Sequence, residues 1–323
     1  MKKKQILWIH NFEKGTGKGG GWMFNQYNFI KDDVDLYFLD NLRNPFSFIK
    51  HIFRLRKLSK QYKIVHAQYG SAVGFITSLL SSTKIISLKG SDWYSAPNPS
   101  LGDKLRIYVG NVMTKFSIRR VDHVIVMSDL MKSQVLEKFP KLKVTTIVDP
   151  INLNRFKPSS EIGKNVNKTK KILFAAVDIE TPVKRFGLAK EAFELLKKRK
   201  PDTELVIMSK IPHHEVCAFM NNMDVILLTS VYEGWPNVVK EMLACNKPFV
   251  STKVSDLEKV AQKTVSCFTC DDDAQELAIA LEKSLGAYKE NLRQHVVEFN
   301  MAQTMKNLKF IYSSLKKTKP KEV

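Results

Sequence analysis

The sequence predicts an α/β protein built from two parallel-sheet domains, and three observations support this prediction. Short apolar segments alternate along the chain with segments of helical pattern, which is typical of parallel sheets with crossover helices. A polar stretch at residues 157–170, containing Pro, Gly, Ser and Asn, divides this pattern into two series and is typical of an interdomain linker. The length of 323 residues is sufficient for two domains of ordinary size.

The first series predicts a domain that spans residues 1–157. Its strands are expected at residues 6–9, 35–39, 64–67, 85–88, 124–127 and 144–148. The amino-terminal residues MKKKQILWIH begin with positive charge, but charge returns at Glu13 and Lys14 before an apolar segment of signal-peptide length has formed. Residues 5–10 are therefore interpreted as the first strand and not as part of a signal peptide.

The second series predicts a smaller domain that spans residues 158–299. Its strands are expected at residues 172–177, 204–208, 225–228 and 249–251. After the second of these strands the chain passes almost directly to residues 211–215, which leaves little room for a further strand and helix. Residues 291–315 carry apolar side chains at helical spacing, so a helix is expected near the end of the chain.

Composition indicates a globular protein with an anionic partner. The net charge is +20, which favours nucleic acid, anionic lipid or a phosphorylated substrate. No apolar segment approaches the ~20 residues of a membrane-spanning helix. The four cysteines include a single C-x-x-C, Cys267 and Cys270, whereas a structural zinc usually needs two such pairs. Thiols in a reducing cytosol are the expected state.

Residues 230–256, SVYEGWPNVVKEMLACNKPFVSTKVSD, carry the clearest chemical signal. Glu233 and Glu241 are separated by seven residues within a strand, loop, helix, strand pattern. Such a loop lies at the carboxyl end of its strand, where open α/β sheets bind ligands. Backbone N–H groups at the helix start suit a diphosphate, whereas a carboxylate suits sugar hydroxyls. The segment therefore predicts a nucleotide-sugar site, with Glu241 expected in the first helical turn.

EGWPNVVKEMLACNKPFVST resembles the E-x7-E signature of the retaining glycosyltransferases of family 4, which have the GT-B fold. Shorter resemblances occur in the same order as in that family and extend the likeness over most of the chain. They are IVHAQYG at 64–70, LKGSD at 88–92, VDHVIVMS at 121–128, DPINLNRFKP at 149–158 and KRF at 184–186. The resemblance implies two Rossmann-like parallel-sheet domains that face each other across a cleft, with a carboxyl-terminal helix, about 300–323, crossing back to the first domain.

The resemblance also implies roles for residues of the second domain. Glu241 is expected to accept hydrogen bonds from ribose hydroxyls and Glu233 to contact the transferred sugar. Lys184 is expected to neutralise the departing diphosphate, although a solvated lysine is the simpler alternative. Arg185 stands where the family has glycine and is a candidate replacement for an arginine missing from the preceding strand. The remaining candidates are the N–H groups of Asn237 and Val238, and Trp235, for which simple packing is the alternative.

Four features of the first domain are candidates for the same site. Gly19, Gly20 and Gly21 follow the first strand and are expected to approach the ligand, with a flexible turn as the alternative. His66 ends a strand and is either a site residue or a core histidine. Lys89 replaces the histidine of the family's H-G-S-D loop, so it is expected to contact phosphate or sugar. Asp92 of the same loop is retained as a catalytic candidate.

Basic side chains are concentrated in the first domain. Residues 43–63 contain seven basic residues and no acidic one, and a second basic segment follows at 104–120. Apolar and basic residues occupy different faces of the first segment, a pattern typical of helices that lie on anionic membranes. The alternative is a crossover helix with a solvated basic face, and both can hold together.

The resemblance, taken with these observations, implies a retaining, metal-independent glycosyltransferase that uses a UDP- or GDP-sugar and no other cofactor. The acceptor is expected to be a polysaccharide, a lipid-linked molecule or another acceptor associated with an anionic membrane, with the enzyme cytoplasmic and peripheral on the inner membrane face. Asp271, Asp272 and Asp273 fit a helix-start cluster better than a metal-binding motif. A nucleotide-sugar epimerase of the same fold and a basic nucleic-acid-binding protein are the alternatives, although neither an acid–base pair nor a nucleic-acid-binding module is evident.

Overall fold

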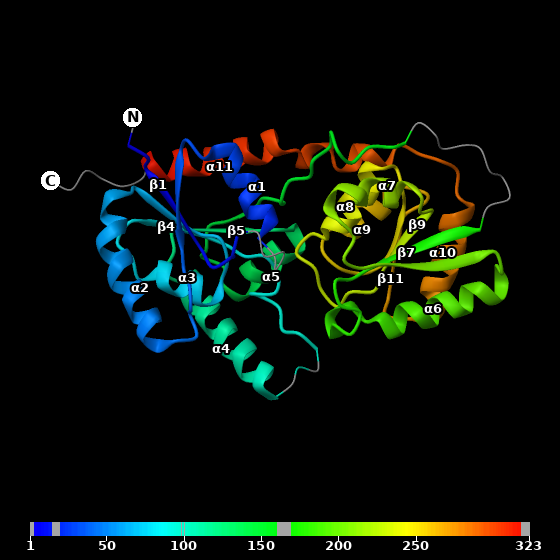
Figure 1. The fold of residues 1–323 in the computed structure, drawn as a ribbon, viewed down its shortest axis with the longest axis horizontal. Helices are drawn as coiled ribbons and strands as arrows, with labels where there is room; N and C mark the ends of the chain where they lie inside the picture. The colour runs from blue at the N-terminus through cyan, green and yellow to red at the C-terminus, as the bar shows by residue number, and fades with distance from the viewer. Residues whose placement is uncertain (1–2, 15–19, 98, 100, 160–168, 318–323) are drawn as a thin grey trace. The chain divides into compact units, whose positions relative to one another are not determined.

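The protein forms two compact units in a computed structural model that describes residues 3–14, 20–97, 99, 101–159 and 169–317 (Figure 1). Unit 1 comprises Met1–Pro150 together with Met301–Val323, and unit 2 comprises Ile151–Asn300. Each unit has its own parallel sheet and its own apolar core. The predicted α/β class with two parallel sheets is therefore confirmed.

Unit 1 contains a six-stranded parallel sheet with the order β2-β1-β3-β4-β5-β6. Its strands are β1 (Ile6–His10), β2 (Val34–Phe38), β3 (Ile64–Ala67), β4 (Thr83–Ser87), β5 (His123–Val126) and β6 (Val144–Thr146). Ile6 of β1 lies in register with Val34 on one side and Ile64 on the other, so β1 lies inside the sheet. All six strands were expected within a few residues of these positions.

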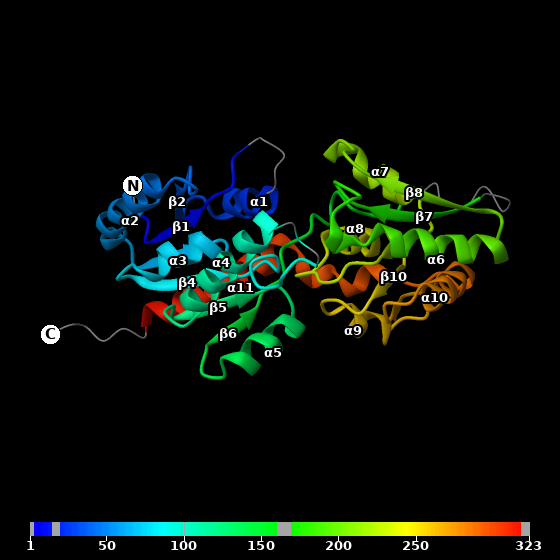
Figure 2. The ribbon, with the colours of Figure 1, turned by 90° about the horizontal axis from the view of Figure 1, so that it is seen from below.

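Helices cover both faces of this sheet (Figures 1 and 2). One face carries α2 (Pro45–Leu58), α3 (Ser71–Ser78), α4 (Leu101–Ile118) and α5 (Asp129–Lys138), with the short 3-10 helix η1 (Ser59–Gln61) after α2. Leu7 and Ile9 of β1 belong to the apolar cluster on this face. Because strand side chains alternate, Trp8 points to the opposite face. That face carries α1 (Gly21–Ile30) and α11 (Met301–Lys317), where Trp8 donates a hydrogen bond of 2.7 Å to Tyr312.

Unit 2 contains a five-stranded parallel sheet with the order β11-β10-β9-β7-β8. Its strands are β7 (Lys170–Ala175), β8 (Thr203–Met208), β9 (Val225–Leu228), β10 (Phe249–Thr252) and β11 (Phe268–Cys270). The edge strand β11 was not expected from the sequence, because three residues are too few to show strand periodicity. It forms by pairing in register with β10.

The helices of unit 2 are α6 (Phe186–Arg199), α7 (Val216–Asn221), α8 (Asn237–Ala244), α9 (Leu257–Ala261) and α10 (Ala274–Gly286). Four 3-10 turns accompany them: η2 (Pro182–Lys184), η3 (His213–Glu215), η4 (Leu292–His295) and η5 (Val297–Phe299). Phe193 of α6 and Leu277 of α10 share one apolar cluster with Ile172 and Phe174 of β7. Helices α6 and α10 therefore cover the same face of the sheet.

Residues 151–157, which the sequence assigned to the first domain, fold with unit 2. The Ile151 N–H donates to the Phe299 carbonyl at 2.8 Å. The Arg293 guanidinium donates to the carbonyls of Leu153 at 2.6 Å and Phe156 at 2.5 Å. The polar stretch begins at residue 157 because polar composition indicates an exposed segment. The boundary between the units lies several residues earlier, because these hydrogen bonds attach residues 151–157 to unit 2. No helix in the described part of the chain is long and apolar enough to cross a membrane.

Candidate active site

The loop between β9 and α8 is held by the hydroxyl groups of buried residues. Thr229 and Ser230 follow β9 directly, and the Thr252 hydroxyl of β10 donates to the Ser230 carbonyl at 2.7 Å. The Ser255 hydroxyl donates to the Gly234 carbonyl at 2.6 Å. Each bond satisfies a carbonyl that the sheet no longer pairs. The loop that carries Glu233 is therefore fixed to the carboxyl edge of the sheet.

Lys184 and Glu233 meet at this edge although they come from different strand–helix connections. Lys184 ends η2, after β7, and Glu233 follows β9, which is paired with β7. The Lys184 Nζ lies 2.6 Å from Glu233 Oε1, and the Ser230 hydroxyl donates to the same oxygen at 2.8 Å. The second oxygen, Oε2, has no hydrogen-bond donor among the residues that the structure describes. Both side chains are partly exposed, so a ligand can reach the pair.

Arg185 connects η2 to the same loop. Its backbone has φ 50°, in the left-handed region that favours glycine, which explains why the resembled family has glycine here. The guanidinium donates to the carbonyls of Thr229 at 2.7 Å and Ser230 at 3.1 Å, and it pairs with Asp272. Because the guanidinium N–H groups are bonded to these carbonyls and to Asp272, the geometry favours a positioning role for Arg185 over the direct ligand contact that the sequence suggested.

The start of α8 presents backbone N–H groups that no side chain caps. Pro236 occupies the N-cap position without a side-chain hydrogen bond, and Asn237 and Val238 are the first two helical residues. Their N–H groups have no acceptor within the helix, which makes this end suitable for an anion. Trp235 just before is buried, and its ring lies 5.3 Å from that of Phe299. This position favours the packing alternative for Trp235.

Glu241 lies in the second turn of α8 and not in the first, so the expectation about its place in the helix is wrong. The helix begins only at Asn237, and its first turn contains no acidic residue. The dipole effect is concentrated in the first turn, so it contributes little here. The carboxyl is largely buried, which raises its pKa to about 7, and the positive charges of Lys240 and Arg155 oppose this shift.

Arg155 is a candidate that the sequence analysis did not single out. Its charge acts on Glu241, and its guanidinium contacts the imidazole of His213 and lies 5.0 Å from the ring centre of Phe156. The Nη2 atom is buried and has no hydrogen-bond partner among the residues that the structure describes. Arg155 lies in the DPINLNRFKP motif, but sequence spacing does not reveal that this motif approaches Glu241.

The glycines of unit 1 have a conformational role at the start of α1. Gly20 is the N-cap residue with φ 82°, and an added Cβ would lie 2.5 Å from the Cβ of Phe12. Only glycine fits this position without a shift of the chain. Gly21 begins α1 with open space around it, and Gly19 lies outside the described residues.

His66 occupies the core of unit 1. Its Nδ1 lies 2.7 Å from the Tyr312 hydroxyl of α11, and its Nε2 lies 2.8 Å from the Ser87 hydroxyl of β4. Burial holds the imidazole pKa well below its usual range. The structure favours the core-histidine alternative, because a neutral ring with both nitrogens bonded inside the fold offers no atom to a substrate.

Asp92 is also completely buried and organises two loops. Its carboxylate accepts hydrogen bonds from the N–H groups of Gly70 at 2.7 Å, Lys89 at 2.8 Å and Gly90 at 3.0 Å. Burial raises the carboxyl pKa, and the three backbone bonds oppose this shift. This arrangement favours a positioning role over the catalytic contact expected from the sequence.

Lys89 is held within unit 1 by an ion pair and an aromatic ring. Its Nζ lies 2.6 Å from Asp149 Oδ1 and 3.8 Å from the ring centre of Trp22. The same Asp149 oxygen accepts from Gln26 at 2.8 Å. A ligand anion at Lys89 would have to compete with this carboxylate.

Comparison with known proteins identifies the family of both units. The family model described as "Glycosyl transferases group 1" matches residues 190–286, and the model "Glycosyl transferase 4-like" matches residues 26–128. The chain is a group 1 glycosyltransferase of the family 4-like type. The matched segments belong to different units, so each unit is recognised by a separate model.

Solved structures show the same GT-B fold for this glycosyltransferase. Sucrose-phosphate synthase from Thermosynechococcus elongatus shares 14% identity at a TM-score of 0.71, with 97% of this chain and 99% of that chain covered. HepE from Anabaena, in complex with UDP and glucose, shares 14% identity at a TM-score of 0.69, with coverage of 96% and 100%. The lipopolysaccharide outer core galactosyltransferase WaaB shares 14% identity at a TM-score of 0.65, with coverage of 96% and 99%. No curated protein matches the sequence.

The three aspartates at 271–273 of the glycosyltransferase form a helix cap and two ion pairs. Asp273 caps α10 by accepting from the Glu276 N–H at 2.8 Å, whereas Asp272 pairs with Arg185 and Asp271 with Lys253. Among the described residues, no group of three or more His, Cys, Asp or Glu side chains is arranged to hold a metal ion. Cys267 and Cys270 are buried thiols, and burial raises the pKa of each to about 11.

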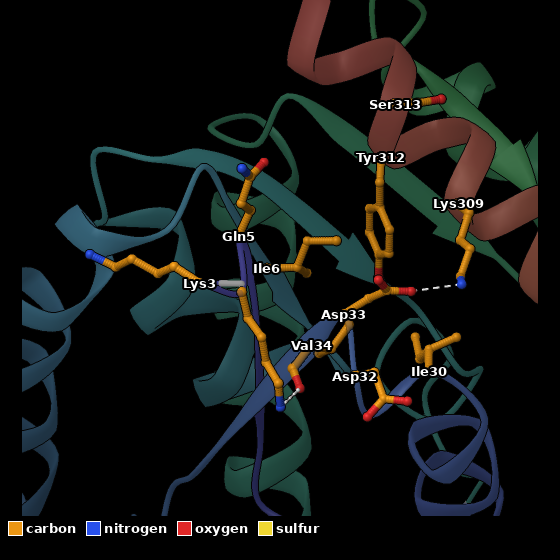
Figure 3. Close-up of a pocket in the computed structure, with 11 residues that line it drawn as sticks. Lys3, Gln5, Ile6, Ile30, Asp32, Asp33, Val34, Lys309, Tyr312 and Ser313 are labelled. Atoms are coloured by element: carbon orange, nitrogen blue, oxygen red, sulfur yellow. Dashed lines mark hydrogen bonds and ion pairs between the residues drawn. The ribbon is translucent and has the colours of Figure 1, made fainter. Parts of the chain in front are cut away.

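A hollow of about 290 Å³ lies in unit 1 at the amino ends of β1 and β2 (Figure 3). Lys309 of α11 pairs with Asp33 at 2.7 Å beside it, and Lys4 donates to the Val34 carbonyl at 3.1 Å. None of the predicted site residues lines this hollow. It lies at the amino edge of the sheet, whereas Gly20 and Lys89 follow strands at the carboxyl edge.

Proposed function

We propose that this glycosyltransferase transfers a sugar from a nucleotide-sugar to a hydroxyl group with retention of configuration and without a metal ion. The observation that carries the proposal is the Lys184–Glu233 pair, with 2.6 Å between Nζ and Oε1, beside the uncapped start of α8. It places a cation, a carboxylate and free backbone donors at one sheet edge. This combination suits a ligand that contains both a diphosphate and a sugar.

Lys184 and α8 would bind the diphosphate. A diphosphate presents several anionic oxygens, so it can displace Glu233 as the partner of the Lys184 ammonium. The N–H groups of Asn237 and Val238 would donate to a second phosphate oxygen, assisted by the helix dipole. These positive groups take the place that a divalent cation holds in metal-dependent enzymes, which supports metal independence.

Glu233 would contact the transferred sugar, and Glu241 would contact the ribose of the nucleotide. Released from Lys184, Glu233 keeps its bond to Ser230 and can accept from a hydroxyl of the transferred sugar. Glu241, next to Arg155, is placed to accept from the ribose hydroxyls. Because HepE is described in complex with UDP and glucose, UDP-sugars are the first donors to test, followed by GDP-sugars.

In the proposed reaction the bond between the anomeric carbon and the diphosphate oxygen breaks, and its electron pair leaves with the diphosphate. The acceptor hydroxyl oxygen bonds to the anomeric carbon on the same face, and its proton passes to the departing diphosphate. Lys184 stabilises the negative charge on the leaving group, and Glu233 stabilises positive charge on the sugar ring. Both effects grow towards the transition state, which is the condition for catalysis.

The acceptor is proposed to be a lipid-linked molecule or a growing polysaccharide at the cytoplasmic face of the membrane. Two observations support this class. Unit 1 carries the basic segment 43–63, which suits an anionic membrane surface. The structural neighbour WaaB is described as a lipopolysaccharide galactosyltransferase.

A thermal-shift screen of UDP- and GDP-sugars tests the proposal. A ligand that binds only the folded protein raises the melting temperature by mass action. At least one nucleotide-sugar should do so, and Glu241→Ala should weaken both the donor and its free nucleoside diphosphate. Glu258→Ala, on an exposed position of α9, is the matched control and should leave the shift unchanged. A wild-type protein that responds to no nucleotide-sugar would contradict the proposal.

A further inference from the structure

We infer that α2 and α4 form one membrane-inserting face of unit 1, and that it engages anionic lipid with both apolar and basic side chains. The inference extends the proposed function, because it names the surface that would bring the enzyme to a membrane-bound acceptor. It is independent of the donor site, which lies in unit 2. Binding to lipid and binding to nucleotide can therefore be measured separately.

The outward face of α2 is apolar as well as basic. Phe46, Ile49 and Phe53 are 84%, 50% and 63% exposed, whereas Leu55 on the inner face is completely buried. Their spacing of three and four residues places them in one stripe along the helix. The sequence predicted a simple division, with apolar residues against the sheet and basic residues outside. The structure shows instead that the helix has more large apolar side chains than its contact with the sheet can cover.

Helix α4 repeats this arrangement. Leu105 and Tyr108 are 67% and 68% exposed, and Val109 and Val112 continue the stripe at helical spacing. Single exposed apolar residues are common, but a row of three on one helix and a row of four on another helix of the same unit require an explanation.

The two stripes belong to one layer. The ring of Phe48 on α2 lies 6.1 Å from that of Phe75 on α3, and Phe75 lies 5.2 Å from Phe116 on α4. These contacts link α2, α3 and α4 as neighbours on the same face of the sheet (Figures 1 and 2). The exposed stripes therefore lie on the outer side of one helical layer.

The positive charge around the stripes favours binding to an anionic partner. Residues 43–63 carry seven basic side chains and no acidic one, and residues 101–120 carry five basic side chains and only Asp103 as an acid. Asp103 is paired with Arg106 at 2.9 Å. Lys50 and Lys57 are exposed beside the α2 stripe. A second copy of this chain would bring two such strongly positive faces together, which disfavours dimerisation through it.

Aromatic side chains combined with lysine and arginine are the composition of helices that lie in the membrane interface. Phe46 and Ile49 of α2, and Leu105, Tyr108 and Val109 of α4, lie in the amino-terminal halves of helices that start at the carboxyl edge of the sheet. Gly20 and Lys89 lie at that same edge. Docking through this face would therefore hold the carboxyl edge of unit 1 near the bilayer, within reach of a lipid-linked acceptor.

Co-sedimentation with vesicles tests the inference. The wild-type protein should bind vesicles that contain anionic phosphatidylglycerol. Raising salt should release only part of it, because salt screens the basic side chains and leaves apolar insertion intact. The triple variant Phe46→Ser, Ile49→Ser, Phe53→Ser should lose the salt-resistant part. The double variant Lys50→Glu, Lys57→Glu should weaken low-salt binding by about 25-fold or more. It spares Arg54, whose positive charge acts on the Tyr37 hydroxyl.

The matched control is Phe29→Ser with Phe310→Ser, which removes two exposed aromatic side chains from α1 and α11 on the other face of unit 1. This variant should bind vesicles like the wild type. All variants should keep the wild-type melting temperature and nucleotide affinity, which separates loss of docking from loss of the proposed donor site. Complete release of the wild type by salt would overturn the inference, as would unchanged salt-resistant binding of the triple variant. A concentration-dependent dimer that the triple variant abolishes would assign the face to a second copy.

Discussion

The residues that match the family's motifs are exposed to different degrees in the two units. In unit 2, Lys184 and Glu233 bind each other and remain partly exposed, so a ligand can exchange with either partner. In unit 1, His66 and Asp92 are completely buried, and their polar atoms are bonded to the fold itself. The difference shows that a motif residue can serve the fold or the ligand, and that burial and bonding partners distinguish the two roles.

The largest expected effect comes from the buried carboxylate of unit 1. Asp92→Ala would leave the N–H groups of Gly70, Lys89 and Gly90 without an acceptor in the interior. The free energy of unfolding should fall by about 3–5 kcal/mol, measured by urea denaturation. Asp103→Ala, on the exposed start of α4, is the control and should cost less than about 0.5 kcal/mol. A variant with wild-type stability and lost activity would assign Asp92 to catalysis after all.

Glu233→Gln should show the opposite behaviour, with activity lost and stability kept. The glutamine preserves volume but removes the charge that faces the sugar, so kcat should fall by about 100-fold or more. The partly exposed ion pair with Lys184 contributes on the order of 1 kcal/mol, so the melting temperature should change little. Nucleoside diphosphate affinity should be retained in calorimetry, and Glu258→Gln serves as the control. Intact transfer by Glu233→Gln would remove this residue from the site.

Glu241 should make nucleotide binding depend on pH. Its carboxyl, with a pKa of about 7, is largely protonated at pH 6 and ionised at pH 8, and only the ionised form accepts from two hydroxyls. Nucleoside diphosphate affinity should therefore rise about tenfold from pH 6 to pH 8. In Glu241→Gln this rise should be lost apart from the titration of the phosphate itself, which is common to both proteins. Identical pH profiles of the two proteins would contradict the ribose contact.

The same pKa also predicts a change in stability. Because the folded-state pKa is raised, the folded protein holds a proton between pH 4.5 and 7 that the unfolded chain has released. Stability therefore falls as pH rises through this window. Glu241→Gln should be more stable than the wild type by about 1–3 kcal/mol at pH 8, and the difference should vanish near pH 4.5.

The smallest effect is expected at Arg185. Arg185→Gly relieves the strain of φ 50° but removes the bonds to Thr229 and Ser230. The opposing contributions should leave a net loss of about 1 kcal/mol in unfolding free energy. Asp272→Asn breaks only the exposed ion pair and should change stability by less than about 0.5 kcal/mol. A more stable glycine variant would show that the guanidinium contributes nothing to the loop.

Much of the fold could be predicted because strands and crossover helices leave a local record in the sequence. The buried segment 225–228 and the pattern that follows it predicted β9, the loop and α8 before any contact was known. The sequence missed strand β11, because three residues are too few to show a strand pattern. The boundary between the units near Ile151 depends on hydrogen bonds to Phe299 and Arg293, which lie far along the chain and leave no local pattern.

By itself, the sequence determined the α/β class, the two sheets and the strand–loop–helix context of the E-x7-E motif, because these follow from periodicity and from residue type at short range. Only the tertiary structure decided which side chains can meet a ligand. It paired Lys184 with Glu233, enclosed His66, and left Phe46 exposed on one face of α2 while it buried Leu55 on the other. Burial and long-range pairing are properties of packing between distant segments, and a linear pattern does not record them.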